Sequence, residues 1–253
     1  MSSNFQFNVI VEDEEVLSKC DTFIAGYHGL GEVGWLTVRH LIDELKTKRV
    51  AIVSSSSAPP FISIENSMIR LPFEIYAYEN VAIFIPRLQP YRHTQVEFSE
   101  KLSEWVLSRK HFSRCFLIGG VDSRLKSGET DTKYVPTRVW LENELEGETK
   151  SDVKKNILDN GLFIAGPLAI ILGMMDLKKF PALGILAYAE RDLPDLQAAA
   201  NVIKVLSEKL GFKISVDNLI KNASLIQEEI SQQLLIEKQN VQEDKDNKPP
   251  TYS

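Results

Sequence analysis

Short apolar runs alternate along the chain with amphipathic stretches, and this alternation restricts the fold more than any other feature. The segments Phe23–Ala25, Val50–Val53 and Phe116–Ile118 are continuously apolar, as strands buried on both faces of a sheet should be. Gln95–Lys110 has the spacing of a helix, with its apolar residues on one face. Alternating strands and helices predict a three-layer α/β fold, in which helices flank both faces of a mostly parallel central sheet.

The remaining elements follow from the same patterns. Strands are predicted over Thr22–Ala25, Arg49–Ser54, Cys115–Val121, Lys133–Trp140, Leu162–Ala165 and Ala182–Ala189. Met68–Tyr78 and Val81–Pro86 are predicted to form a meander of strands, with polar turns at Pro72 and Glu79-Asn80. Helices are predicted over Glu32–Leu45, Lys150–Asn160, Pro167–Met175 and Asp195–Leu210. Pro167 suits the first position of a helix, and Gly211 suits a helix end.

The composition divides the chain into three parts. Residues 1–215 form the predicted α/β domain, and residues 216–240 form one helical pattern whose apolar positions are Leu219, Ala223, Ile226, Ile230 and Leu234. This helix either closes onto the domain or pairs with another helix in an oligomer. Residues 241–253 are charged and then proline-containing. We expect them to be a flexible tail, because they cannot bury enough apolar area to order themselves.

Charge and cysteine content exclude several classes of function. The chain has 29 Lys and Arg against 35 Asp and Glu and lacks a basic block, so binding of nucleic acid is not expected. The longest apolar run, Leu168–Met175, is too short to span a bilayer, and Met1–Asp13 does not have the pattern of a signal peptide. Cys20 and Cys115 have neither disulfide nor metal spacing. We therefore expect a cytoplasmic protein that does not bind a membrane.

The sharpest local motif is a glycine loop between a predicted strand and a predicted helix. After Gly26, the glycines at 29, 31 and 34 match the dinucleotide pattern G-x-G-x-x-G, in which backbone amides approach a pyrophosphate. Gly26, Gly29, Gly31 and Gly34 are therefore a possible ligand loop.

Other residues argue against a nucleotide in this loop. The acidic residue that holds a ribose about 20 positions further on is replaced by Ser54–Ser57, and Glu32 at the helix start would repel phosphate. The glycines can equally serve a tight turn and close contact between helix and strand.

Glu190 is a second candidate ligand residue. It follows the predicted strand Ala182–Ala189, at the end of a parallel strand where ligand crevices form in α/β folds. An ion pair with Arg191, or a cap for the helix that starts near Asp195, would explain it without a ligand.

No residue pattern predicts a catalytic group, a cofactor or a metal site. The histidines stand apart, without a paired spacing that could hold a metal. Neither the serine nucleophile motif G-x-S-x-G nor the triphosphate-binding loop G-x-x-x-x-G-K-[ST] is present.

Several of these motifs form an ordered series. The series comprises Gly26–Gly34, Ser54–Pro60, Gln89, Gly119-Gly120, Gly166-Pro167-Leu168, Glu190, Asp195 with Ala198-Ala199, and Asp217 with Leu219. In this order, the motifs resemble the PAC2 family of proteasome assembly chaperones and their archaeal homologues, over roughly residues 11–225. The chain departs from the family pattern where Arg87-Leu88 replaces Gly-Asp, Leu196 replaces Pro, and Pro167 replaces Ser.

The resemblance gives significance to the last three residues, Thr251-Tyr252-Ser253. Proteasome-binding chaperones and activators often end in a hydrophobic residue, a tyrosine and any residue. The resemblance thus implies an assembly chaperone or activator-like protein without catalysis, which binds 20S proteasome α-subunits through Thr251, Tyr252 and Ser253. It further implies a homo-oligomer, with a paralogous chaperone as another conceivable partner.

Two other functions remain open from the sequence. The first is a nucleotide- or phosphate-binding enzyme that uses the Gly26–Gly34 loop with Glu190. The second is a scaffold whose helix over residues 216–240 pairs with an unrelated partner.

Overall fold

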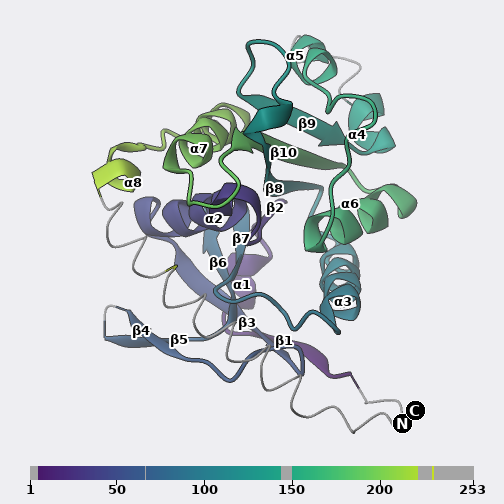
Figure 1. The fold of residues 1–253 in the computed structure, drawn as a ribbon. Coiled ribbons are helices and arrows are strands. Elements are labelled where there is room, and N and C mark those ends of the chain that lie inside the picture. The colour runs from purple at the N-terminus through teal and green to yellow at the C-terminus, as the bar shows by residue number, and fades with distance from the viewer. Residues whose placement is uncertain (1–4, 66, 144–149, 222–229, 231–253) are drawn as a thin grey trace, which may run out of the picture.

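A large mixed sheet organises the molecule (Figure 1). The computed structural model describes residues 5–65, 67–143, 150–221 and 230. Within them, eight strands form one sheet in the order β1-β3-β6-β7-β2-β8-β10-β9. The strands are β1 (Phe7–Val11), β2 (Thr22–Gly26), β3 (Lys48–Ser55), β6 (Phe73–Tyr78), β7 (Val81–Pro86), β8 (Arg114–Asp122), β9 (Thr132–Pro136) and β10 (Ala182–Ala189).

The α/β class is confirmed, but the expected mostly parallel pairing holds only for the middle of the sheet. The neighbouring strands β7, β2, β8 and β10 pair in parallel, whereas β1, β3 and β6 at one side and β9 at the other pair antiparallel. Only two residues, Glu79 and Asn80, separate β6 from β7. Such a short connection makes a hairpin, because parallel neighbours need a long crossover.

Helices cover both faces of the sheet, as the sequence predicts (Figure 1). Helices α2 (Val33–Glu44) and α7 (Leu196–Leu210) lie on one face, and α3 (Gln95–Ser108) and α6 (Pro167–Leu177) lie on the other. Alternate residues of β2 enter the two cores: Ile24 packs with the α2 and α7 side, while Phe23 and Ala25 pack with the α3 and α6 side. The continuous apolar runs are thus strands buried on both faces.

Three predicted elements differ in the structure. Leu162–Ala165 is a loop that leads into α6 and not a strand. The predicted strand Lys133–Trp140 ends with β9 at Pro136, and α4 (Arg138–Asn143) follows after Thr137, whose hydroxyl accepts the N–H of Ala182 at 3.0 Å. The predicted helix Lys150–Asn160 is only the short α5 (Lys150–Lys155), because the chain then turns back to bond with Tyr134.

Several short elements lack a clear pattern in the sequence. They are the edge strand β1, the helix α1 (Glu14–Leu17), the 3-10 turns η1 (Leu30–Glu32) and η2 (Ser123–Leu125), and the strand β4 (Ser63–Glu65), which pairs with β5 (Met68–Arg70) in a small separate sheet.

Of the predicted helix over residues 216–240, the structure describes α8 (Asp217–Lys221) and the buried Ile230. Val216 precedes α8, and residues 222–229 and 231–240, like the tail from 241 to 253, lie outside the described part of the chain. Among the described helices, none is long and apolar enough to cross a membrane.

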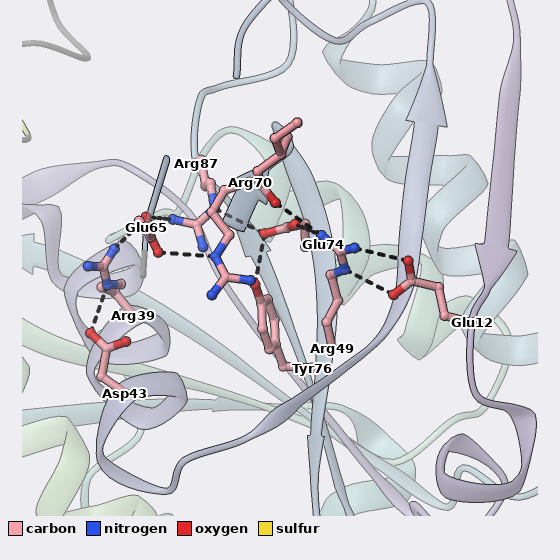
Figure 2. Close-up of polar contacts among 10 residues, drawn as sticks. Glu12, Arg39, Asp43, Arg49, Glu65, Arg70, Glu74, Tyr76 and Arg87 are labelled. Carbon is pink, nitrogen blue, oxygen red and sulfur yellow. Dashed lines mark hydrogen bonds and ion pairs between the residues drawn. The ribbon is translucent and has the colours of Figure 1, made fainter. Parts of the chain in front are cut away.

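A buried carboxylate, Glu74 on β6, is the centre of an ionic network in the antiparallel part of the sheet (Figure 2). One of its oxygens accepts a hydrogen bond from Arg49 at 2.7 Å. The other accepts hydrogen bonds from Tyr76 at 2.9 Å and from Arg87 at 3.1 Å. Both oxygens are therefore satisfied, as a charge removed from water requires.

The network continues to Glu65 on β4 (Figure 2). This carboxylate pairs with Arg87, with Arg39 of α2 at 3.1 Å, and with Arg70 at 3.4 Å. Burial opposes the positive charge of Arg87, but the carboxylates of Glu65 and Glu74 outweigh burial and raise the pKa of the guanidinium. Arg87 thus stays charged and joins the β4-β5 hairpin to the main sheet.

Replacement of Arg87 by methionine tests the contribution of this network to stability. Arg87 is almost fully buried between two carboxylates, and loss of one partner of a buried ion pair typically costs about 3–5 kcal/mol. We expect Arg87→Met to lower the free energy of unfolding in urea by about 3 kcal/mol, because Glu74 keeps its bonds to Arg49 and Tyr76. The control Lys101→Ala breaks an exposed pair with Glu104 and should cost at most about 1 kcal/mol. Equal effects of the two variants would contradict this prediction.

Candidate functional site

The glycine loop connects β2 to α2 by direct backbone contact. A Cβ atom on Gly26 would lie 2.1 Å from the carbonyl oxygen of Gly34. A Cβ atom on Gly34 would lie 2.5 Å from the carbonyl oxygen of Tyr27 and 2.6 Å from that of Ile118 on β8. These two glycines therefore let the first turn of α2 rest on β2 and β8, and their contacts require no ligand.

Other residues of the protein pack directly against Gly31. Its φ of +60° lies in the left-handed region, and a Cβ atom here would lie 2.6 Å from the Cβ of Ala189 and 3.1 Å from that of Asp195. The Asp195 N–H also donates to the Gly31 carbonyl at 2.9 Å. The turn between β10 and α7 thus covers the glycine that a pyrophosphate would approach in a dinucleotide site.

Gly29 differs from the other three glycines of the loop. No atom lies within 4 Å of a Cβ built on it, and its φ of 178° is extended backbone that any residue adopts. Of the possible ligand loop, Gly29 is the member that faces open space.

Side chains around the loop hold it in place. The His28 Nδ1 lies 2.5 Å from the Glu32 Oε2, within hydrogen-bond distance, and the His28 ring stacks on Trp35 with 5.2 Å between ring centroids. The Gln89 side chain donates to the His28 carbonyl at 2.6 Å. Gln89, which is part of the motif series in the sequence, therefore supports the loop.

The main chain of Glu190 lies beside Gly31. Its carboxylate is exposed and accepts a hydrogen bond from the Ser123 hydroxyl at 3.4 Å. The cap of α7 is Asp195, whose carboxylate accepts the N–H of Ala198 at 2.9 Å and that of Glu190 at 3.1 Å. The structure brings Glu190 to the loop, where its main chain serves packing and capping.

A cavity of about 490 Å³ lies next to Gly29, at the carboxyl ends of the parallel strands β2 and β8. Apolar residues predominate in its lining, which includes Leu30, Ile118, Leu125, Phe163, Leu168 and Leu186. The sequence does not indicate this cavity, because one wall comes from residues 162–165, which were predicted to be a strand. Its place in the fold is the one where α/β proteins bind ligands, and its volume is within the usual range for pockets.

Polar groups at the cavity are few. Asp122 lines it and is paired with Arg124, whose Nε lies 2.9 Å from the Asp122 Oδ1. Hydrogen bonds from the Arg124 side chain and main chain lower the pKa of the Asp122 carboxyl to about 2. Arg191 also lines the cavity. Tyr27 and His28 line it as well. The cavity is therefore a mainly apolar site whose charged lining residues are Asp122, paired with Arg124, and Arg191.

Comparison with known proteins identifies the family. The model of the PAC2 family matches residues 23–234, which include the whole glycine loop, β8, the cavity and α7. This chain belongs to the PAC2 family. The resemblance that the motif series predicts is thereby confirmed.

Solved structures with the same fold extend the comparison. Pyrococcus furiosus PbaA, described as an archaeal homolog of proteasome-assembly chaperone, has a TM-score of 0.78 at 22% identity, over 93% of this chain and 100% of its own. Pyrococcus furiosus PbaB, described as an archaeal proteasome activator, has a TM-score of 0.69 at 22% identity, over 89% and 98% of the two chains. An uncharacterized protein of Methanocaldococcus jannaschii is 23% identical over 88% of this chain and 89% of its own length.

The two cysteines of this PAC2 protein are not placed as nucleophiles. Both are buried. Burial, with a smaller contribution from the Asp21 carboxylate, raises the pKa of the Cys20 thiol to about 11, and burial raises the pKa of the Cys115 thiol well above its ordinary value. A thiol acts as a nucleophile only as the thiolate, so neither cysteine is activated at neutral pH. Across the described segments, no cluster of three or more His, Cys, Asp or Glu is arranged to hold a metal ion.

Alanine substitutions at Gly34 and Gly29 compare a tightly packed glycine of the loop with one that has open space around it. Alanine at position 34 gains about 1 kcal/mol of helix propensity, but its Cβ would overlap two backbone carbonyls. We expect Gly34→Ala to lose about 1–3 kcal/mol of stability in urea unfolding, as overpacked cores do. Gly29→Ala, with open space around it, should change stability by no more than about 0.5 kcal/mol. A stable Gly34→Ala protein would show that the turn can move.

Thiol reactivity tests the burial and raised pKa of the cysteines. Ellman's reagent at pH 7.5 should titrate neither Cys20 nor Cys115 in the folded protein, because both thiols are buried and protonated. Both should react at once in denaturing urea. Rapid reaction of either thiol in the native protein would contradict the structure around it.

Proposed function

We propose that this protein is a chaperone-like factor that assists assembly of the 20S proteasome or caps it, and that it acts by binding and not by catalysis. The observation that carries the proposal is family membership across residues 23–234. Two solved structures that share the fold over about nine-tenths of this chain are described as an archaeal homolog of proteasome-assembly chaperone and an archaeal proteasome activator. The site geometry agrees with a binding protein, because the loop glycines at 26, 31 and 34 have packing roles.

We infer that the contact with proteasome α-subunits is made by Thr251, Tyr252 and Ser253. These residues lie outside the part of the chain that the structure describes, so the mechanism is argued from their chemistry. The Tyr252 ring buries apolar area while its hydroxyl keeps a hydrogen bond. The Ser253 carboxylate can form a charge-assisted bond with a lysine at the base of a groove, and capture of a terminal carboxylate is an established mode of peptide recognition.

One tail of three residues supplies a small contact, so the number of copies matters. Several tails on one homo-oligomer, or on a complex with a paralogous chaperone, would bind with a high effective concentration after the first tail is seated. The α/β body thus acts as a platform that presents the tails together.

Deletion of Thr251–Ser253 tests this mechanism. We expect the truncated protein to bind 20S particles or α-rings at least tenfold more weakly in surface-based binding assays, since multivalent contacts amplify the loss of each one. Its oligomeric mass should not change. Tyr252→Ala should behave like the deletion, whereas Tyr252→Phe should keep most of the binding because the ring remains.

Two results would contradict the proposal at different levels. Unchanged proteasome binding by the truncated protein would show that the tail is not the binding element, while the proteasome would remain the proposed partner. Failure of the intact protein to retain 20S particles or α-rings from a native lysate would exclude the partner itself.

A further inference from the structure

The apolar cavity lies where the parallel part of the sheet sends its connections to opposite faces. Strands β2 and β8 are parallel neighbours. The chain after β2 turns into α2 on one face of the sheet, whereas the chain after β8 leads, through β9, α4 and α5, to α6 on the other face (Figure 1). Connections that part in this way leave a crevice between the carboxyl ends of the two strands, and open α/β sheets bind small ligands there.

The lining of the cavity suits a ligand with an apolar body. Ile118, Leu168 and Leu186 are buried, while Leu125 and Phe163 are 48% and 86% exposed. Large apolar side chains that stay exposed around a hollow are typical of a binding site. The volume of about 490 Å³ is within the range of cavities that hold small organic molecules.

The charges of the lining indicate the polar part of the ligand. Asp122 accepts hydrogen bonds from the Arg124 Nε at 2.9 Å and from the Arg124 main-chain N–H at 3.0 Å, so this pair is neutral as a whole. Arg191 lines the cavity and makes no ion pair with any residue that the structure describes. The carboxylate of its neighbour Glu190 instead accepts a hydrogen bond from Ser123. The lining therefore has one positive charge in excess.

The beginning of α6 adds to this positive potential. Pro167 and Leu168, the first two residues of the helix, line the cavity. The positive end of a helix dipole lies at its N-terminus and favours a nearby negative group. The guanidinium of Arg191 is in addition a donor whose planar geometry matches a carboxylate.

We propose that the cavity binds a small monocarboxylic acid with an apolar body, of the kind represented by a medium-chain fatty acid. Its carboxylate pairs with Arg191, and its chain packs against Ile118, Leu168 and Leu186. A neutral apolar molecule would leave the charge of Arg191 unmatched, and a phosphate dianion would bring one negative charge more than the lining neutralises. This site is independent of the proposed function, because it requires neither the tail nor the proteasome.

Isothermal titration calorimetry of the full-length protein with hexanoate, octanoate and decanoate tests the proposal. Each added methylene should tighten binding about fourfold, because burial of one methylene contributes about 0.8 kcal/mol. At the same chain length, 1-octanol should bind about fivefold more weakly than octanoate, since it lacks the charge that pairs with Arg191. Octylammonium, which brings a second positive charge, should not bind.

Two variants separate the parts of the site. Arg191→Gln should weaken decanoate binding about fivefold and remove the preference for octanoate over 1-octanol. Leu125→Glu places a negative charge at the apolar lining and should weaken binding at least about tenfold. Both positions are exposed, so each variant should fold. The matched controls, Arg138→Gln on α4 and Leu177→Glu on α6, lie at exposed positions away from the lining and should bind as the unmodified protein does.

Three results would overturn the proposal. They are the absence of binding by all three acids at millimolar concentration, unchanged binding by both Arg191→Gln and Leu125→Glu, and equal binding of octanoate and 1-octanol by the unmodified protein. Circular dichroism spectra that match those of the unmodified protein show that a loss of binding is not caused by unfolding. The titrations contain no proteasome, so their failure would be distinct from failure of the tail mechanism.

Discussion

The contact between Gly26 and the Gly34 carbonyl determines how closely α2 approaches the sheet, and the surrounding structure depends on this distance. A Cβ at position 26 would lie only 2.1 Å from that oxygen. The same close approach brings the Leu30 carbonyl over Gly120, where a Cβ would lie 2.3 Å away, and places Gly31 against the turn between β10 and α7. A wider gap would separate α2 from β8 and open the base of the cavity. The loop has the spacing of a nucleotide motif, yet here its backbone atoms contact protein.

The two parts of the sheet are stabilised by different interactions. In the parallel part, β2, β8 and β10 contribute apolar residues to cores on both faces. In the antiparallel part, Arg87 and Glu74 are both nearly or fully buried and satisfy each other with help from Arg49 and Tyr76. Buried ion pairs often add less stability than apolar packing of equal volume. However, any rearrangement that leaves one of the buried charges unpaired has a high cost in free energy. Their effect is to fix the position of the β4-β5 hairpin.

The proposed binding function agrees with several features of the candidate site. The cysteines are buried with raised pKa values, and His28 is engaged with Glu32 and Trp35. Of the charged residues that line the cavity, Asp122 is paired with Arg124, and Arg191 is the other. The cavity lining is predominantly apolar, and Ile62, Ile64 and Ile69 at the β4-β5 hairpin are exposed. Exposed apolar surfaces are typical of sites where proteins associate.

The sequence by itself determined the elements whose signals are local. Continuous apolar runs predicted strands buried on both faces, helical spacing predicted the four covering helices, and the ordered motifs predicted the family. Tertiary structure decided the rest, because it depends on residues far apart in the chain. The two-residue turn at Glu79-Asn80 predicted the antiparallel pairing of β6 with β7. The antiparallel pairing of β1 with β3 and of β9 with β10 joins segments that are far apart in the chain, so no local pattern indicated it. The role of each glycine depends on what lies opposite it, and Ala189 and Asp195 are more than 150 positions from Gly31. The ionic network collects charges from several segments that the sequence presents as ordinary surface residues.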